Sequence, residues 1–228
     1  AEYFEKLDSS IITIEPLLVA DFDDDTLYLH SDTIVANLDS LQQQQIKAFT
    51  GAKFYSKNLQ GKCQLLYYYM RDSTIHMYNE PILWSDNYQL TSEDVILEIK
   101  NNVIDKMNLL QNAFIISEDS LNLYNQIKGR NMMGFFKRNE LHKINVNGNG
   151  QAVYVIKDEE DKISGINTVS CSQMNIYVDN KEIHRISFKN QPNTTIYPIE
   201  ELPKKWKRLE GFKERYVERI IDKEDIWD

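Results

Sequence analysis

The sequence predicts an all-β protein made of stacked units that each bend into a V. A pattern of eight residues recurs five times, beginning at Ile46, Ile75, Met107, Ile144 and Ile186. An apolar, a polar and another apolar residue are followed by turn-forming residues, which is typical of a half-buried strand that runs into a bend. The starts lie 29, 32, 37 and 42 residues apart. Repeats of this length stack, because one unit alone cannot bury its apolar face.

The alternation inside the pattern predicts which side chains face inward. The first column, given by the five starts, and the third column are always apolar, and the third holds Ala48, Met77, Leu109, Val146 and Phe188. The second column is always polar and holds Lys47, His76, Asn108, Asn145 and Ser187. Successive side chains of a strand point to opposite faces. We therefore expect the first and third columns to line the interior and the second to face water.

Apolar pairs three residues apart give a second indication of bending. They precede the pattern in three units, as Ile104/Met107, Leu141/Ile144 and Ile183/Ile186. A strand would place the members of each pair on opposite faces, so both can point inward only if the chain bends or bulges between them. Such a corner would fold each unit into a V or a coil.

Composition is the third observation that favours strands. The chain has 13 Tyr and 9 Phe but only 8 Gly and 5 Pro, which is a strand-forming composition. With 228 residues, 42% of them hydrophobic, it can build one large domain or two small ones. Its net charge of −9 predicts no nucleic-acid partner, because a phosphate-binding face needs clustered Lys and Arg.

Taken in order, the chain is expected to enter an incomplete first unit near Ile11, because residues 15–19 resemble residues 80–84. A strand is expected at 27–38. Four fuller units follow, at 60–84, 88–116, 128–155 and 165–197. Residues 121–127 fit either a strand or a short helix, and residues 158–162 fit a hairpin loop.

From Pro203 the character of the sequence changes. Leu209, Phe212, Tyr216 and Ile220 fall at helical spacing. We expect a short helical or extended tail that closes the last unit, since an open β edge invites aggregation. The predicted division is therefore a domain of five to six repeat units at 1–203 and a C-terminal cap or tail at 204–228.

Motifs of catalysis are missing from the sequence. It contains no G-x-S-x-G, no P-loop and no H-E-x-x-H, so no enzyme and no cofactor are predicted. Asp105, His142 and His184 would share one column of the repeat, but each follows an inward apolar residue and is expected to face water, so no metal site is predicted. The acidic run at 21–25 fits a solvated turn better than a calcium loop.

The two cysteines, Cys63 and Cys171, do not make a disulfide framework. They lie three units apart in the predicted stack, which is roughly 14 Å at the spacing of strands. A disulfide tolerates a Cα separation of no more than about 7 Å, so we expect both thiols to be free.

Several short segments share their residues with one known family. They are FY at 54–55, LQGKC at 59–63, DSTI at 72–75, PILWS at 81–85, QLT at 89–91, NAFIIS at 112–117, NQIKG at 125–129 and LEGF at 209–212. Together they resemble the OstA-like (organic solvent tolerance) family of periplasmic lipopolysaccharide-transport proteins, in the branch found in Bacteroidetes. The resemblance covers roughly residues 10–215 and rests on structural motifs.

The resemblance implies a β-jellyroll, or β-taco, whose V-shaped rungs hold the acyl chains of lipopolysaccharide. It implies a periplasmic location, with association to the outer membrane left open. No signal peptide is visible in this chain, and its start at Ala1 fits a processed or trimmed N-terminus and equally an engineered one. The implied partners are lipopolysaccharide or its lipid A acyl chains, and other transport components that pair with the edge strands. End-to-end self-association is expected at the same edges.

The leading hypothesis is a non-catalytic lipid-binding protein that carries or bridges lipopolysaccharide across the periplasm to the outer membrane. Its lipid-binding groove, assigned from the two apolar columns, would be lined by Ile75, Met77, Met107, Leu109, Ile144, Val146, Ile186 and Phe188. A structural or adhesion scaffold remains an alternative, in which the same side chains fill each other's space as a closed core. A polysaccharide-acting β-helix enzyme is a further alternative, and it would need clustered Asp, Arg or Lys on an exposed sheet.

Overall fold

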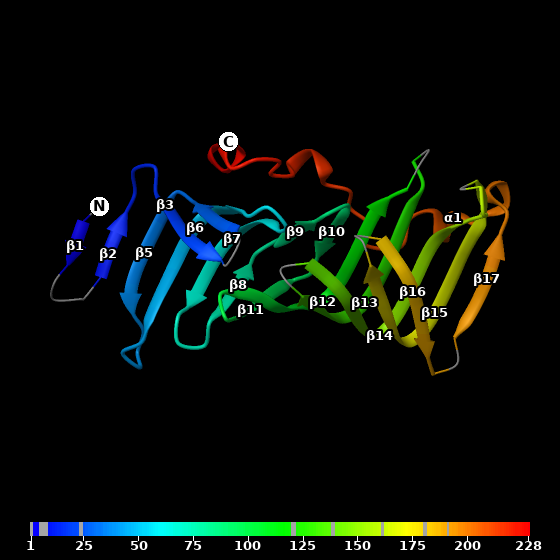
Figure 1. Cartoon of the computed structure of the whole chain (residues 1–228), viewed down its shortest axis with the longest axis horizontal. Coiled ribbons are helices and arrows are strands. Elements are labelled where there is room, and N and C mark those ends of the chain that lie inside the picture. The colour runs from blue at the N-terminus through cyan, green and yellow to red at the C-terminus, as the bar shows by residue number, and fades with distance from the viewer. Residues whose placement is uncertain are drawn as a thin grey trace.

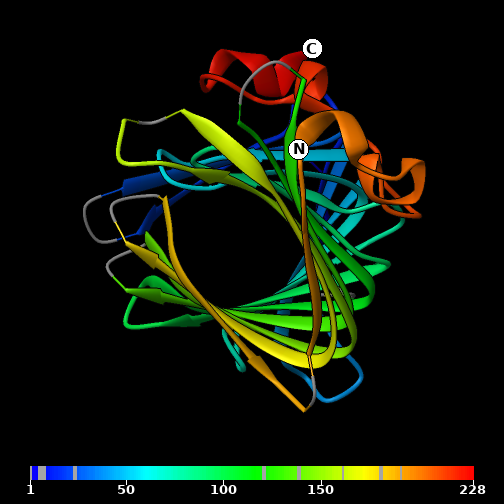
Figure 2. The same ribbon diagram turned by 90° about the vertical axis from the view of Figure 1, so that its right-hand side faces the viewer.

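The computed structural model describes residues 2–4, 9–22, 25–119, 122–137, 140–160, 162–179, 182–190 and 192–228. Within these residues, 17 strands form a single twisted antiparallel sheet with one short α-helix (Figure 1). The predicted all-β fold class is confirmed. Viewed along the stack, the units superpose and the C-terminal segment lies outside them (Figure 2).

The strands follow the predicted units closely, except that the single strand expected at 27–38 was wrong: the chain breaks at residues 31–32 and forms two strands with different partners. The strands are β1 (Glu2–Phe4), β2 (Ser9–Ile12), β3 (Leu17–Phe22), β4 (Asp25–His30), β5 (Thr33–Leu38), β6 (Gln44–Tyr55), β7 (Gln60–Tyr69), β8 (Thr74–Tyr78), β9 (Ile82–Ser85), β10 (Tyr88–Thr91), β11 (Asp94–Lys100), β12 (Val103–Glu118), β13 (Tyr124–Lys137), β14 (Glu140–Lys157), β15 (Ile163–Asp179), β16 (Glu182–Lys189) and β17 (Asn193–Tyr197). The segment at 121–127, left open between strand and helix, contributes the start of β13.

Six long strands pass through both arms of the V. They are β6, β7, β12, β13, β14 and β15. Of these, β6, β7, β12 and β15 pair with one short strand before the bend and with another after it, whereas β13 and β14 pair with long strands along their whole length. β6, for example, pairs with β5 through residues 44–49 and with β4 through residues 53–55. We call the arm that contains β2, β5, β8, β11 and β16 face A, and the arm that contains β3, β4, β9, β10 and β17 face B.

The corner between the faces is built from pairs of residues in the left-handed backbone region. The pairs are Thr50/Gly51 (φ 61° and 69°), Asn79/Glu80 (60° and 61°), Gln111/Asn112 (60° and 51°) and Gly148/Asn149 (79° and 53°), with Asn190 (61°) in the last unit. They occupy the fifth and sixth columns of the repeat, where the sequence collects Asn, Gly, Gln, Glu and Thr. Left-handed backbone is uncommon outside Gly and Asn, so its recurrence here confirms the predicted bend.

A second irregularity recurs within face A. Glu98 pairs with Lys106 and Ile99 pairs with Ile104, so Asp105 is an extra residue in the ladder. His142 and His184 are extra in the same way in β14 and β16. These β-bulges let both members of each apolar pair point inward, as the sequence predicted: Ile104 and Met107 are both buried in the core.

The C-terminal segment, residues 199–228, runs along the outside of face B (Figure 1). It holds the turns η2 (Ile199–Glu201), η3 (Tyr216–Glu218) and η4 (Glu224–Trp227) and the helix α1 (Lys204–Lys207). We call this segment the tail. Of the two forms expected for the tail, the extended one holds beyond α1, because the chain leaves the helix in an extended conformation at Arg208 and turns at Gly211 (φ 91°). In the described part of the chain the tail also forms no strand pairing with β16 or β17, so it does not close the last unit as expected.

Other sequence expectations can be placed on this fold. Cys63 and Cys171 are both free, as predicted. Part of the acidic run at 21–25 lies outside the described residues. No helix among those that the structure describes is long and apolar enough to cross a membrane.

Candidate functional site

The eight residues predicted to line a groove all lie on the inner side of face A, where β11, β13 and β15 stand between the strands that carry them. They come from β8, β12, β14 and β16, in consecutive units of the stack. Met77, Met107, Leu109 and Val146 are completely buried, Ile75 and Ile144 nearly so, and all six belong to a single apolar cluster. Ile186 and Phe188 pack against that cluster and are only partly buried. The structure therefore brings all eight together.

The opposite wall comes from face B and was missed by the sequence reading. Its inner side chains belong to the same cluster and include Phe54, Cys63, Leu83, Leu90, Ile115, Ala152 and Val169. The sequence did contain a signal for these residues, in the seventh position of the eight-residue pattern and two residues after it. Ala52 and Phe54, and likewise Ala113 and Ile115, are buried because alternation resumes after the left-handed pair.

The middle of the space between the faces is filled by these side chains. Leu109 on face A and Leu90 on face B have no exposed surface. Cys63 is only 2% exposed, and this burial raises the pKa of its thiol to about 12. In this part of the stack the two walls pack on each other as a closed core.

The C-terminal end of the stack is different, because the walls separate there. A cleft of about 600 Å³ lies between Ile183 and Ile186 of β16 on face A and Tyr154 and Ile156 of β14 on face B. Ile196 of β17 pairs with Asn167, which contacts Tyr154, and it is 62% exposed. Apolar side chains that would be covered inside the stack are thus accessible at this end.

The rim of the cleft is charged. Lys157 and Asp119 pair at 3.3 Å across the ends of β14 and β12, and His184 and Arg185 of β16 stand on the other side. The site therefore combines an apolar floor with a mixed polar rim, which is the arrangement that an amphipathic ligand requires.

The second column of the repeat lies on the outer side of face A, as predicted. Lys47, His76, Asn108, Asn145 and Ser187 are half-buried there. His76 lies among Thr74, Tyr69 and Tyr78, and burial lowers its pKa. The bulged residues Asp105, His142 and His184 share a column but belong to alternate strands. At two strand spacings, roughly 10 Å apart, they do not meet at one metal ion.

A row of side chains on the outer side of face B fastens the tail. We call it the glutamine row: Gln60, Trp84, Gln89, Ile116, Gln126 and Val153 are successive cross-strand neighbours. Gln126 donates to the carbonyl oxygen of Lys207 (3.0 Å) and accepts from the backbone N–H of Leu209 (2.8 Å). Gln89 repeats this arrangement with Lys213 and Arg215, at 2.7 Å each. Each side-chain amide thus donates to one tail carbonyl and accepts from one tail N–H, as the backbone of a neighbouring strand would.

Ionic contacts support the same attachment. The Glu218 carboxylate accepts from Arg215 at 2.6 and 2.7 Å and from Lys62 of β7 at 2.9 Å. The bonds to Arg215, followed by those to Lys62, hold the pKa of Glu218 at about 2. The Tyr216 hydroxyl lies 3.0 Å and 3.1 Å from the carbonyl oxygens of Asn87 and Ile116, and burial raises its pKa to about 12.

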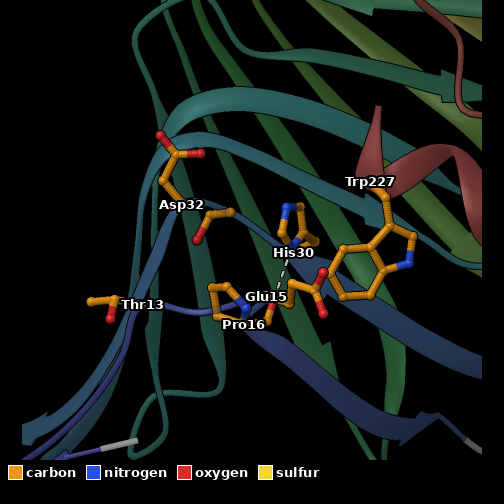
Figure 3. A pocket seen from close by; sticks show the side chains of 7 residues that line it. Thr13, Glu15, Pro16, His30, Asp32 and Trp227 are labelled. Atoms are coloured by element: carbon orange, nitrogen blue, oxygen red, sulfur yellow. Dashed lines mark hydrogen bonds between the residues drawn. The ribbon is translucent and has the colours of Figure 1, made fainter.

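The tail ends at a hollow on the outside of the first unit (Figure 3). The hollow is about 490 Å³ and is lined by His30, Asp32, Glu15 and Trp227 among others. The His30 and Trp227 rings lie 4.4 Å apart, and His30 Nδ1 donates to the Pro16 carbonyl oxygen at 2.8 Å. This hollow is polar and lies outside the space between the faces, so it is a separate feature from the groove.

The fold and the site define an all-β stack with an apolar space between two sheet faces that opens at one end. No family model matches the sequence, and no curated protein matches it. Among solved structures, the chain is similar to the crystal structure of LptH from Pseudomonas aeruginosa, described as the LptA homologous periplasmic component of the conserved lipopolysaccharide transport device. That likeness has a TM-score of 0.44 at 10% identity and covers 61% of this chain and 95% of that chain.

Proposed function

We propose that the protein is a non-catalytic lipid carrier or bridge that holds acyl chains between faces A and B. The observation that supports this most directly is the cleft at the C-terminal end. There the first apolar column of the repeat continues to Ile186 without becoming fully buried. Each methylene that leaves water for apolar surroundings gains about 0.8 kcal/mol, so the apolar side chains of the cleft favour the entry of an acyl chain.

The identity of the lipid follows from the sequence resemblance. Lipopolysaccharide, or its lipid A acyl chains, is the ligand that the OstA-like segments imply, in the Bacteroidetes-type branch. The same resemblance supports a periplasmic location and contacts with other transport components through the edge strands β16 and β17. A repeat domain at 1–203 with a separate tail at 204–228 completes this proposal.

A structural scaffold is the second candidate, and the closed middle of the stack favours it. Met77, Leu109 and Val146 fill the space between the faces without a gap for a ligand. For lipid to pass along the whole stack, faces A and B would have to part there. In a scaffold they would stay closed.

Site-specific photo-crosslinking separates the two candidates. A photoreactive residue at Ile186 borders the cleft, while the same residue at Ser187 points to the outer side of the same strand. After incubation with lipopolysaccharide, we expect crosslinks from Ile186 and few from Ser187. The adjacent positions share strand, depth and solvent access, so Ser187 is a matched control.

Crosslinking at positions in the middle of the stack then shows how far the lipid moves along it. Met77, Leu109 and Val146 are to be compared with their outward neighbours His76, Asn108 and Asn145. Crosslinks from the inner set would show that the faces part. Equal capture by Ile186 and Ser187, or none from either, would leave the scaffold as the better account.

A further inference from the structure

A basic segment of the tail stands out from the charge of the whole chain. Residues 204–208 read KKWKR, with four cations around one tryptophan in a protein of net charge −9. They form α1 and the residue after it, on the outside of face B. The four cationic side chains are exposed, and Trp206 is half-buried.

Beside this segment lies an apolar pocket of about 410 Å³, which we call the outer pocket. The tail forms one side of it through Ile199, Leu202 and Trp206, and strands β14 and β15 form the base through Val153 and Ile166. Val153 and Ile166 are 2% exposed and face away from the groove, on the outer side of face B. The outer pocket is therefore independent of the cleft between the faces.

Arg208 is held in place at the mouth of the outer pocket. Its guanidinium carbon lies 4.3 Å from the Tyr124 ring centroid and 4.6 Å from that of Phe212. It donates to the carbonyl oxygens of Lys207 (2.8 Å) and Asn122 (3.1 Å). Arginine has five N–H donors, so several remain for a ligand. In the part of the chain that the structure describes, no carboxylate pairs with Arg208, and Glu210 nearby is bonded to Lys128 at 3.3 Å.

We propose that the outer pocket and the basic segment are a docking surface for an anionic lipid bilayer. One acyl chain enters the outer pocket, its phosphate meets Arg208 and Lys207, and Trp206 lies at the level of the headgroups. Clustered Lys and Arg attract anionic lipid surfaces, and Trp favours the interface between headgroups and chains. Docking here would place the end of the stack that carries β15 and β17 against the membrane. An acidic protein partner would use the same charges but would not need an apolar pocket.

Vesicle co-sedimentation tests the proposal with the full chain. We expect the protein to bind vesicles of phosphatidylcholine mixed with phosphatidylglycerol, to bind pure phosphatidylcholine much less, and to lose binding as salt is raised. Replacing Lys204, Lys205 and Lys207 by Gln should weaken binding about 100-fold. The matched control replaces Lys57, Lys100 and Lys189, which are exposed elsewhere, and alters net charge equally. It should bind nearly as the wild type does.

A second readout addresses the acyl chain. In a Trp227→Phe variant, Trp206 is the accessible tryptophan, because Trp84 is fully buried. Brominated acyl chains should quench its emission, and a brominated lipid in a neutral vesicle should not. Folding of every variant is checked by its thermal transition.

Two results would overturn the proposal: equal binding to neutral and anionic vesicles, or equal losses in the two triple variants. Binding without quenching would show that charge alone acts and that the outer pocket is not used. A Phe188→Asp variant in the groove should still bind vesicles. Vesicle binding by this variant therefore distinguishes a failure of the docking proposal from a failure of the proposed lipid transport.

Discussion

Faces A and B share six strands and one core, yet their outer sides differ. The outer side of face A carries polar and aromatic side chains that are half-buried and uncovered, such as Asn108 and Asn145. On the outer side of face B, Trp84 and Ile116 have almost no exposed surface, because the tail lies over them. Face B is thus packed on both sides and face A on one. Strand alternation determines which side chains are buried on the inner sides of both faces. On the outer side of face B, burial is determined by a segment that is distant in the sequence, the tail.

The largest expected effect compares the two sides of one strand in face A. Leu109→Asp places a charge without a partner in the closed core, and we expect it to lower the free energy of unfolding by about 4 kcal/mol or more. Asn108→Ala, one residue earlier on the outer side, loses only the hydrogen bond to the Glu98 carboxylate and should cost about 1 kcal/mol. Chemical denaturation of both variants measures the difference. Similar losses would contradict the assignment of the two sides.

An intermediate effect compares the outer sides of the two faces. Gln126→Leu leaves the Lys207 carbonyl and the Leu209 N–H without their partners, and we expect a loss of about 2 kcal/mol. Gln173→Leu, at an exposed position on the outer side of face A, should cost little. Thermal unfolding of the pair is the measurement. If both changes were neutral, the glutamine row would not hold the tail.

The smallest effect concerns pH and the ionic attachment of the tail. The pKa of Glu218 is lowered from an ordinary 4.5 to about 2, so the folded protein favours its charged form. Its contribution is complete above pH 4.5 and is lost as the pH falls toward 2. We expect Glu218→Gln to cost about 1 kcal/mol at neutral pH, and this difference to vanish across that window. A Glu140→Gln variant, exposed on face A, should follow the wild type throughout.

Much of face A could be predicted from the sequence because its determinants are local. Alternation identified Met77 and Leu109 as inward, and the apolar pairs identified the bulges, since both patterns act over a few residues. The tail is the opposite case. Leu209 and Ile220 are buried, but their helical spacing in the sequence left a helix and an extended tail equally open. Its backbone bonds go to glutamines more than 80 residues away, which no local pattern contains.

A trace of that contact was present in the sequence. Gln60, Gln89 and Gln126 are 29 and 37 residues apart, which are spacings of the repeat itself, and each lies in a segment that carries the family resemblance. A buried polar column at the repeat period predicts a partner for its amides. The inward residues of face B could have been predicted in the same way, from the columns that follow the corner. Which inward residues of face A contact which residues of face B could not be predicted, because those contacts depend on how the units twist against each other.

The attachment of the tail also has a mechanical side. Between its bonds to Gln126 and Gln89 the tail advances six residues, from Leu209 to Arg215. An extended chain of that length would reach about 20 Å, whereas the two strand spacings between those glutamines measure about 10 Å. The turn at Gly211 takes up this difference in length. The tail therefore holds face B through separate points of attachment with a turn between them, and not as one continuous extended strand.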